Sequence, residues 1–270
     1  DGLSDPLFAQ AEEIAHGLGA LLEDPDAVAR RQLALPPYES PLLHRGALPP
    51  SHDLLGVAPP LRSQGKRNTC VAFAALAVRE QLEIADGAPQ DLDLSEQYVY
   101  WWCKQHDGLA ERAGTYLSFG MRCLAESGAP LEALWPYASA PAADVDLEDP
   151  PRDAAAGDRA FRTLHTQEFN RADLGGMKAC LAEGRAIACS IPVYHSWFKS
   201  SATSRWGKIT LPLPQEPVAE GHAITLFGYQ DDPLAPGGGY FLVRNSWQPW
   251  AWAGAWQPGY GYIPYAYMAH

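Results

Sequence analysis

The stretch that decides the fold spans residues 61–78 and reads Leu-Arg-Ser-Gln-Gly-Lys-Arg-Asn-Thr-Cys-Val-Ala-Phe-Ala-Ala-Leu-Ala-Val. A polar loop leads into Thr69, and an unbroken run of apolar helix formers follows it. Threonine satisfies the first backbone N–H groups of a helix, so the pattern predicts an N-cap at Thr69 and a helix that begins at Cys70. The apolar residues recur at helical spacing, as at Phe73 and Ala77, and are expected to face a core.

The position of Cys70 favours a reactive thiol. At the first position of a helix, the thiol feels the positive end of the helix dipole and lies among unpaired backbone N–H groups, and both favour the thiolate. We expect the helix to be buried and its first residue to be exposed. Gln64, beside the flexible Gly65, can direct its carboxamide N–H toward the Cys70 backbone N–H, where the two would stabilise an oxyanion. The alternative is a small apolar cysteine buried at a helix start.

Composition indicates a folded globular protein. The chain has 270 residues, of which 47% are hydrophobic and 11% aromatic, and no apolar run is long enough to span a bilayer. The net charge is −12, and no cluster of Lys and Arg residues compensates for it anywhere in the sequence. This argues against a nucleic-acid or anionic-membrane partner. The first residues lack the basic and apolar regions of a secretory leader. We expect a soluble protein, cytoplasmic or secreted and processed.

The five cysteines form no CxxC pair and no zinc-ligand spacing, so we do not expect zinc. We also expect no other metal and no organic cofactor. If Cys70 is kept for chemistry, the other four could pair with one another. Their modest number slightly favours reduced thiols. These four are Cys103, Cys123, Cys180 and Cys189.

The chain is expected to have two parts: an extension of residues 1–47 and a main domain of residues 48–270. The pattern predicts an amphipathic helix over residues 6–22 and a short helix over residues 25–33. A proline-rich connector, residues 35–60, is expected to run extended along the surface, outside any core.

Helices are predicted in the first half of the main domain and strands in the second. Ser95 can cap a helix with a heavy aromatic load, and Gly128 can close the helix that opens at Gly114. One further helix is expected at residues 173–184, and strands are expected at residues 163–169, 186–193, 221–230, 239–245 and 259–267. A helical lobe followed by a sheet lobe predicts an α+β fold with a cleft between the lobes.

His222 is the best candidate for a base. It follows Gly221 at the start of an apolar strand, and the next strand ends at Asn245. If the two strands are neighbours, the Asn245 side-chain oxygen can accept a hydrogen bond from the imidazole and fix its tautomer, with Trp247 shielding the pair from water. The other seven histidines have no such partner in sequence, and we interpret them as structural or solvent-exposed.

Six motifs carry a resemblance to a known family, in that family's order: Gln64-Gly65 with Cys70, Leu94-Ser95-Glu96-Gln97, Trp135-Pro136-Tyr137, Gly221-His222-Ala223, Asn245-Ser246-Trp247 and Gly259-Tyr260-Gly261-Tyr262. From Leu48 to Met268 the chain resembles the papain-like cysteine peptidases. Its closing tyrosine-rich motif looks like that of bacterial members. The resemblance implies a two-lobe fold, with a helical lobe, an antiparallel sheet or barrel lobe and the active-site cleft between them.

The resemblance also implies a role for each matching residue. Cys70 would be the nucleophile and His222 the general acid/base. Asn245 would orient the imidazole, and Gln64 would donate to the oxyanion. Trp247 would shield the Asn–His pair and border the leaving-group side.

A further set of residues is implied for substrate binding. Gly114, Thr115 and Tyr116 match the segment on which a peptide substrate would lie extended and pair main chain to main chain. Tyr116, Ala223 and Ser190 would line the main specificity pocket.

The chain departs from the family pattern around the nucleophile. Arg67 stands where a disulfide cysteine is usual, so the disulfide that staples this loop must be absent. Asn68 replaces a glycine, and Val71 replaces the tryptophan after the nucleophile. Beyond Trp247, Gln248 and residues 250–254 depart from the usual glycine-rich sequence. None of these changes removes a catalytic group.

The sequence therefore predicts a thiol endopeptidase that cleaves peptide or protein substrates through a Cys70 thioester. One alternative is a transpeptidase or peptide-maturation enzyme that passes the thioester to an amine. Another is a catalytically silent peptide-binding relative. Residues 1–47 could be an inhibitory pro-segment or a helix packed on the outer surface, and the sequence leaves both open.

Overall fold

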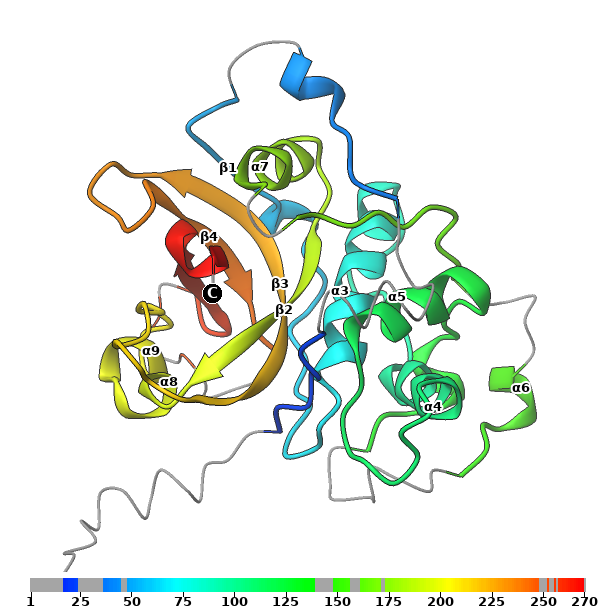
Figure 1. Ribbon diagram of the computed structural model, residues 1–270. Helices are drawn as coiled ribbons and strands as arrows, with labels where there is room; N and C mark the ends of the chain where they lie inside the picture. Colours follow the sequence, from blue (N-terminus) through cyan, green and yellow to red (C-terminus); the bar gives the residue numbers. More distant parts are fainter. Residues whose placement is uncertain are drawn as a thin grey trace, which may run out of the picture.

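The computed structural model describes residues 17–23, 36–44, 48–138, 148–155, 161–170, 173–247, 252, 255 and 257–269. Two lobes stand side by side, one of helices and one built on a sheet (Figure 1). The α+β architecture with two lobes is as predicted.

The first lobe packs three helices around an apolar cluster: α3 (Cys70–Ala85), α4 (Glu96–His106) and α5 (Leu117–Glu126). Helix α3 begins at Cys70 as predicted, although Thr69 makes no side-chain cap hydrogen bond. Ser95 does cap α4, because its hydroxyl accepts from the Tyr98 N–H at 3.1 Å. Gly128, with φ +74°, follows α5 and turns the chain out of the helix.

The second lobe contains an antiparallel sheet of five described strands: β1 (Ser51–Asp53), β2 (Ile187–Tyr194), β3 (Val218–Asp231), β4 (Gly239–Arg244) and β5 (Tyr260–Pro264). The order is β1-β3-β4-β5, and β2 pairs with another part of β3. The long strand β3 can have three partners because β2 pairs with its first half and β1 with its last residues. Four of these strands match predicted segments.

Shorter elements complete the described chain. These are η1 (Pro41–His44), η2 (Leu55–Val57), η3 (Glu132–Leu134), α6 (Arg152–Ala155), α7 (Leu174–Ala182), α8 (Ser196–Lys199), α9 (Ser201–Ser204) and η5 (Tyr265–Ala269). The Asp173 carboxylate caps α7 by accepting from the Gly176 N–H at 2.8 Å. None of the helices in the described part of the chain is long and apolar enough to cross a membrane.

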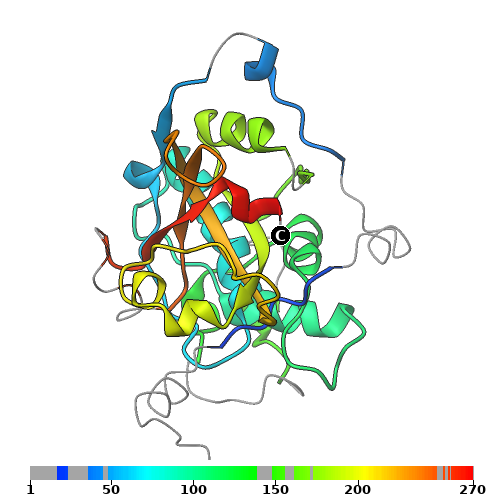
Figure 2. The same cartoon turned by 60° about the vertical axis from the view of Figure 1, so that its left-hand side comes forward.

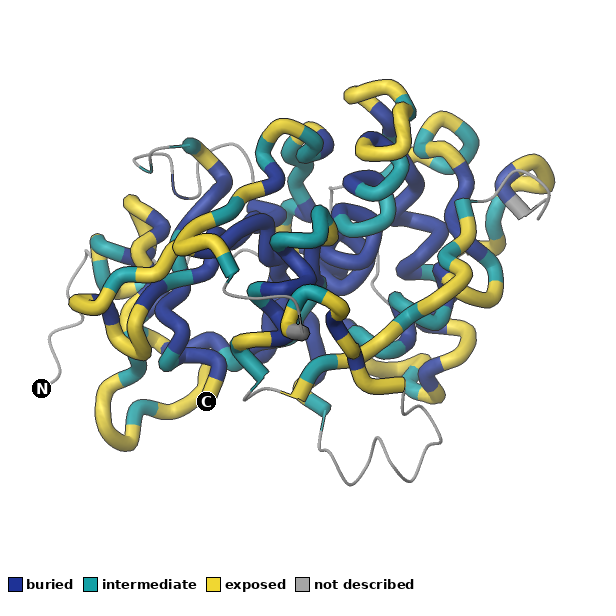
Figure 3. Tube along the Cα trace, turned by 90° about the horizontal axis from the view of Figure 1, so that it is seen from above, coloured by how far each residue is buried: buried dark blue, intermediate teal, exposed yellow. Residues whose placement is uncertain are grey.

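Helix α3 joins the two lobes. It packs on β3 and β2 (Figure 2), and the Thr225 hydroxyl donates to the Ala74 carbonyl at 3.3 Å. Along α3 the residues from Cys70 to Ala77 are all buried. Figure 3 shows buried chain concentrated in the middle of the molecule, where the lobes meet. Cys70 therefore lies between the two lobes rather than on the surface of either.

The structure corrects the prediction for the N-terminal extension. Residues 17–22, the described part of the helix predicted for residues 6–22, form no helix and make an isolated bridge from Ala20 to Thr115. Their backbone groups pair with other segments: Leu21 N–H donates to the Thr115 carbonyl at 2.9 Å, and Gly19 adopts φ +105°. A helix would use those groups internally, so these tertiary hydrogen bonds exclude it. The remaining residues of that helix and the predicted helix over residues 25–33 lie outside the described residues.

Two other predictions are wrong. The proline-rich connector is not entirely outside the core, because Tyr38 and Leu54 are buried in the sheet lobe and residues 51–53 form the edge strand β1. Residues 163–169 form no strand: among the described residues the segment makes an isolated bridge, at Glu168 to Pro37. In both places tertiary pairing overrides the local pattern.

Candidate active site

Cys70 lies beside the start of the apolar part of β3. The Ala223 N–H donates to the Cys70 Sγ at 3.3 Å, and Ala223 directly follows His222. Both Cys70 and His222 have no exposed side-chain surface. The structure thus places the thiol of the helical lobe against the backbone of the residue that follows His222 in the sheet lobe, although 152 positions in sequence separate Cys70 from His222.

The β3–β4 pairing brings His222 and Asn245 together. Thr225 pairs with Arg244, which sets the end of β4 beside the start of the apolar run of β3. His222 Nε2 lies 2.8 Å from Asn245 Oδ1, and the Ser246 N–H donates to the same oxygen at 2.8 Å. Because a carboxamide oxygen only accepts, Nε2 carries the proton and Nδ1 is the nitrogen on the opposite side of the ring.

Trp247 covers this pair. Its ring stacks on the His222 ring with centroids 4.5 Å apart and planes 27° apart, and it is 4% exposed. Burying the His–Asn hydrogen bond removes competing water and strengthens it. The arrangement predicted from the Asn245-Ser246-Trp247 motif is present.

Gln64 is held between the two lobes. Its Oε1 accepts from the Ser246 hydroxyl at 2.6 Å, and its backbone N–H donates to the Ser246 carbonyl at 2.9 Å. Its Nε2 donates to the carbonyl oxygens of Gly17 at 2.7 Å and Arg67 at 2.8 Å. The carboxamide N–H is therefore directed into the site, where it meets a carbonyl oxygen of the N-terminal extension.

Residues 17–23 run between the two lobes (Figure 1). Ala20 packs with Cys70 and Ala223 in one buried cluster, and its backbone contacts the thiol, so this segment covers it. The Gly17 carbonyl also accepts a hydrogen bond from Trp247 Nε1 at 3.1 Å. Further along the segment, the Thr115 N–H donates to the Gly19 carbonyl and the Leu21 N–H donates to the Thr115 carbonyl, both at 2.9 Å. Glu23 accepts from the Ser118 hydroxyl. The segment thus occupies the strip where a peptide substrate was predicted to pair.

Glycines on both rims allow this close approach. A Cβ at Gly114, whose φ is +83°, would lie 2.4 Å from the Gly19 carbonyl oxygen, and a Cβ at Gly221 would lie 2.0 Å from the Ala20 carbonyl oxygen. Any side chain at either position would push the segment away. The backbone of residues 19 and 20 therefore fits between Gly114 and Gly221 because neither position carries a side chain.

The state of Cys70 differs from the sequence prediction. Cys70 is fully buried rather than exposed, and burial raises the pKa of its thiol to about 12, although backbone hydrogen bonds with Ala223 and Ala20 partly counter this effect. Desolvation penalises the charged form more than the helix dipole and the N–H groups favour it. In the covered site the thiol is protonated at neutral pH.

Arg67 replaces the expected disulfide with a set of side-chain contacts. Arg67 is 98% buried. Its guanidinium donates to Gln97 Oε1 at 2.7 Å and to the Ala138 carbonyl at 3.0 Å, and lies 4.9 Å from the Tyr137 ring centroid. The Tyr137 hydroxyl in turn contacts the Gln64 carbonyl at 2.8 Å and the Thr69 hydroxyl at 2.7 Å. The loop of residues 64–69 is therefore held by the contacts of a buried guanidinium, where a disulfide was expected in related sequences.

All five cysteines are free, so the four thiols besides Cys70 do not pair with one another. Burial raises the pKa of each: for Cys180 it rises to about 11 and for Cys189 to about 12. Protonated, buried thiols are inert. These cysteines pack as small apolar residues.

The predicted pocket residues lie on two sides of residues 17–23. Ser190 pairs with Ala223 across β2 and β3, and Tyr116 precedes α5 on the opposite side. The Ser190 hydroxyl is buried and has no hydrogen-bond partner in the described part of the chain. The residues predicted to line the specificity pocket therefore lie on either side of the predicted substrate strip, Ser190 and Ala223 on the sheet lobe and Tyr116 on the helical lobe.

Sequence reasoning missed two contributions to the site, the contacts of the Arg67 guanidinium and the Ser246 hydroxyl on Gln64. It allowed an inhibitory extension but predicted a helix where residues 17–23 pair with Thr115. Arg67 could have been found as a charged residue where a disulfide cysteine was expected. Gly17 and Gly19 were signals against a helix in the cover, because glycine disfavours helix interiors.

The structure places a cysteine, a histidine and an asparagine near one another where a helical lobe meets a sheet lobe. A family model described as "Papain family cysteine protease" matches residues 51–265. The chain belongs to the papain family of cysteine proteases.

Solved structures support the fold. Xylellain, a cysteine protease from Xylella fastidiosa, shares 24% identity over 95% of this chain and 92% of its own, with a TM-score of 0.76. Procathepsin B from Trypanosoma congolense shares 20% identity over 94% of this chain and 82% of its own, with a TM-score of 0.68. A cysteine protease from Carica candamarcensis in complex with E-64 shares 22% identity over 80% of this chain and 89% of its own, with a TM-score of 0.60.

Proposed function

We propose that this chain is a cysteine endopeptidase whose intact form is latent because residues 17–23 cover Cys70. What supports catalysis is the meeting of the Cys70 thiol with the strand that carries His222, itself hydrogen-bonded to Asn245. What supports latency is that the extension uses the Gln64 donor and the backbone strip beside Thr115. In this proposal residues 48–270 are the peptidase domain and residues 1–47 the inhibitory extension.

In the uncovered site, His222 Nδ1 takes the proton of the Cys70 thiol, and the thiolate attacks the carbonyl carbon of the peptide bond. The Gln64 Nε2–H and the Cys70 backbone N–H stabilise the resulting oxyanion. His222 then protonates the leaving amine as the C–N bond breaks and a thioester forms.

Water completes the reaction. His222 removes a proton from the water as its oxygen attacks the thioester carbonyl, the C–S bond breaks, and the proton returns to sulfur. The carboxylic acid leaves and the thiol is restored. Asn245 holds the Nε2–H side of the ring throughout, so that Nδ1 stays directed to the reaction.

The extension binds as an inhibitor and not as a substrate. The carbonyl oxygen nearest the Gln64 Nε2 belongs to Gly17, whereas the backbone group that contacts the thiol belongs to Ala20. Attack requires that one peptide unit meets both groups. Because these contacts come from residues three positions apart, no single peptide bond of the segment has both.

The connector anchors the extension. The Tyr38 hydroxyl and the Ser40 hydroxyl both donate to the Glu183 carboxylate, at 2.8 and 2.6 Å, at the end of α7. Residues 17–23 are therefore tethered to the domain they cover. A tethered inhibitor has a high effective concentration and closes the site even when its own contacts are weak.

The test is labelling of Cys70 by a peptidyl epoxide, followed by mass spectrometry of the intact chain and of Gly17→Ala. A Cβ at Gly17 would lie 1.8 Å from the Arg67 carbonyl oxygen, so this substitution displaces the cover. Burial raises the pKa of the Cys70 thiol, so little of it is ionised at pH 8 while the cover is in place, and the cover also blocks access to it. We expect labelling at pH 8 to be at least about tenfold faster in Gly17→Ala.

The matched control is Gly56→Ala, because a Cβ at Gly56 meets nothing within 4 Å. It should label as slowly as the intact chain, and a chain that lacks residues 1–47 should label as fast as Gly17→Ala. Equal, fast labelling of all four chains would show that the extension is structural. Absence of labelling at Cys70 in every chain would favour the silent peptide-binding relative.

Transpeptidation remains the second candidate, because the same thioester can pass to an amine. Product masses separate the two reactions. Hydrolysis gives a free carboxylic acid that carries the elements of water, whereas transfer gives a new amide that carries the added amine. Cleavage inside a blocked peptide would establish the endopeptidase activity, and loss of terminal residues alone would contradict it.

A further inference from the structure

The peptide group that joins Gly114 to Thr115 has one side in the cleft and the other inside the helical lobe. On the cleft side, the Thr115 N–H donates to the Gly19 carbonyl of residues 17–23 at 2.9 Å. On the inner side, the Gly114 carbonyl accepts from Lys104 Nζ at 3.0 Å. A trans peptide group is planar and its C=O and N–H point in opposite directions. A group that fixes the Gly114 carbonyl therefore also fixes the direction of the Thr115 N–H.

Lys104 is a residue of α4 whose ammonium group lies inside the helical lobe. Its side chain is 4% exposed, and its Nζ lies 3.0 Å from the Asp107 carboxylate. The same nitrogen donates to the carbonyl oxygens of Leu109 at 2.8 Å and Arg112 at 2.7 Å. A buried ammonium is costly unless it is paired and hydrogen-bonded. Here every one of these acceptors comes from the loop that leads from α4 to the substrate strip, residues 114–116.

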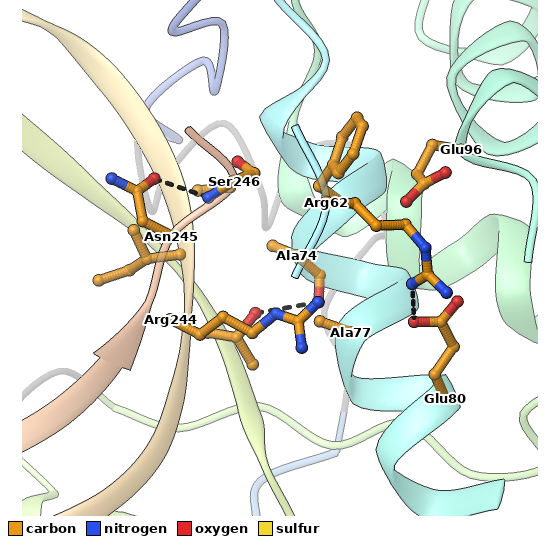
Figure 4. Close-up of a pocket in the computed structure, with 12 residues that line it drawn as sticks. Arg62, Ala74, Ala77, Glu80, Glu96, Arg244, Asn245 and Ser246 are labelled. Carbon is orange, nitrogen blue, oxygen red and sulfur yellow. Dashed lines mark hydrogen bonds and ion pairs between the residues drawn. The ribbon is translucent and has the colours of Figure 1, made fainter. Parts of the chain in front are cut away.

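A second buried ion pair of the helical lobe shows the contrast. Arg62 donates to Glu80 of α3 at 2.8 Å, beside the small cavity between the lobes (Figure 4). Arg62 also donates to the Leu92 carbonyl at 2.7 Å, ahead of α4. Neither of these acceptors belongs to the substrate strip. The Arg62 pair therefore holds the lobe, whereas the Lys104 pair reaches the strip itself.

Gly114 depends on such contacts because its own backbone is free to rotate. Its φ of +83° lies in the region that glycine adopts readily, and residues 107–114 form no helix or strand. The Gly114 N–H donates to the Tyr100 hydroxyl at 3.0 Å. Tyr100 lies four residues before Lys104 on α4, so the two side chains share one face of that helix. Together they hold the peptide groups on both sides of Gly114.

We propose that Lys104 is a positioning residue for substrate binding, which directs the Thr115 N–H into the cleft and strengthens it as a donor. A charge-assisted hydrogen bond to the carbonyl polarises the whole peptide group, and the N–H of that group becomes a better donor. This proposal rests on the proposed function, because it requires that a peptide substrate pairs with Thr115 as residues 17–23 do.

The kinetic experiment uses the uncovered Gly17→Ala chain and two substrates. One is a blocked peptide, whose backbone can pair with Thr115, and the other is nitrophenyl acetate, which carries no amide group. In Lys104→Gln, which removes the charge, kcat/KM for the peptide should fall at least about tenfold, mainly through KM. For the acetate it should change less than about twofold. A merely structural role would lower both values in parallel through loss of folded enzyme.

The matched control is Lys178→Gln, because Lys178 forms its ion pair with Asp231 at the end of β3, at 2.6 Å. It should leave both substrates unchanged. If Lys104→Gln does not fold, the double variant with Asp107→Asn is measured in its place, since it leaves no buried charge unpaired. The asparagine keeps an oxygen for the Leu109 N–H, which donates to Asp107 Oδ1 at 2.8 Å.

Amide hydrogen exchange in the intact chain tests the same role without turnover. Exchange of the Thr115 N–H should be at least about tenfold faster in Lys104→Gln and unchanged in Lys178→Gln. The Val99 N–H, which donates to the Ser95 carbonyl in α4, is the internal reference and should not change.

The two experiments separate the two proposals. If the Gly17→Ala chain cleaves neither substrate, the proposed peptidase fails, and the exchange of the Thr115 N–H alone decides the role of Lys104. The role of Lys104 is overturned if kcat/KM for the peptide and the acetate change in parallel. It is also overturned if the Thr115 N–H exchanges in the variant at the rate of the intact chain, or if Val99 accelerates equally.

Discussion

The two walls of the cleft are held in different ways. On the sheet wall, backbone pairing of β3 with β4 sets His222 beside Asn245, and the register of the ladder positions both side chains. On the helical wall, residues 64–69 form a loop held by contacts of the Arg67 and Tyr137 side chains. A ladder spreads its stability over many equivalent hydrogen bonds, whereas a loop depends on a few. Single substitutions are therefore expected to change the helical wall more than the sheet wall.

The largest effect is expected at Cys70, where the two walls meet. In the uncovered Gly17→Ala chain, Cys70→Ala removes the nucleophile and should lower peptide turnover by at least about 10⁴-fold. The circular dichroism spectrum and Tm should stay close to those of the parent, because alanine fits the same helix position. Retained hydrolysis in this variant would remove the basis for the proposed mechanism.

Gln64→Ala should have the next largest effect and tests the helical wall directly. In the same uncovered background, loss of one oxyanion donor should lower kcat by about 10²- to 10³-fold with a smaller change in KM. Steady-state kinetics on a peptide substrate measures both. An unchanged kcat would show that the oxyanion is held by groups other than the Gln64 carboxamide.

Arg67→Ala should destabilise the loop itself. The substitution leaves Gln97 Oε1 and the Ala138 carbonyl without their donor and opens space against Tyr137, so we expect the free energy of unfolding to fall by about 2–4 kcal/mol. Denaturant titration measures this. Arg122→Ala, which breaks a surface pair with Glu126, is the control and should cost less than about 1 kcal/mol. Similar losses in both variants would contradict the staple role of Arg67.

The smallest expected effect is that of Ser246→Ala, which removes one hydrogen bond between the walls. The Gln64 Oε1 loses the hydroxyl that donates at 2.6 Å, while the backbone bond from Gln64 to Ser246 remains. We expect a loss of about 1 kcal/mol in stability and a modest fall in kcat. A fall in kcat as large as that of Gln64→Ala would show that the hydroxyl, and not the backbone, positions the carboxamide.

Much of the candidate site could be predicted because its signals are local. A helix start, the glycine before His222 and the Asn-Ser-Trp motif each lie within a few residues of the group they position. The hydrogen bond between His222 and Asn245 follows once β3 and β4 are taken as neighbours, since sequential strands commonly pair. The reactive state of Cys70 could not be predicted, because it depends on what lies over the thiol.

The sequence by itself determined the family, the two-lobe order of helices and strands, and the identities of the residues gathered at the site. These follow from caps, hydrophobic periodicity and short motifs, which act over a few residues. The tertiary structure alone decided that Cys70 is buried beneath residues 17–23, and that the Arg67 guanidinium holds the loop through Gln97, Ala138 and Tyr137. Each depends on contacts between residues far apart in the chain, whose energies are set by burial and close approach.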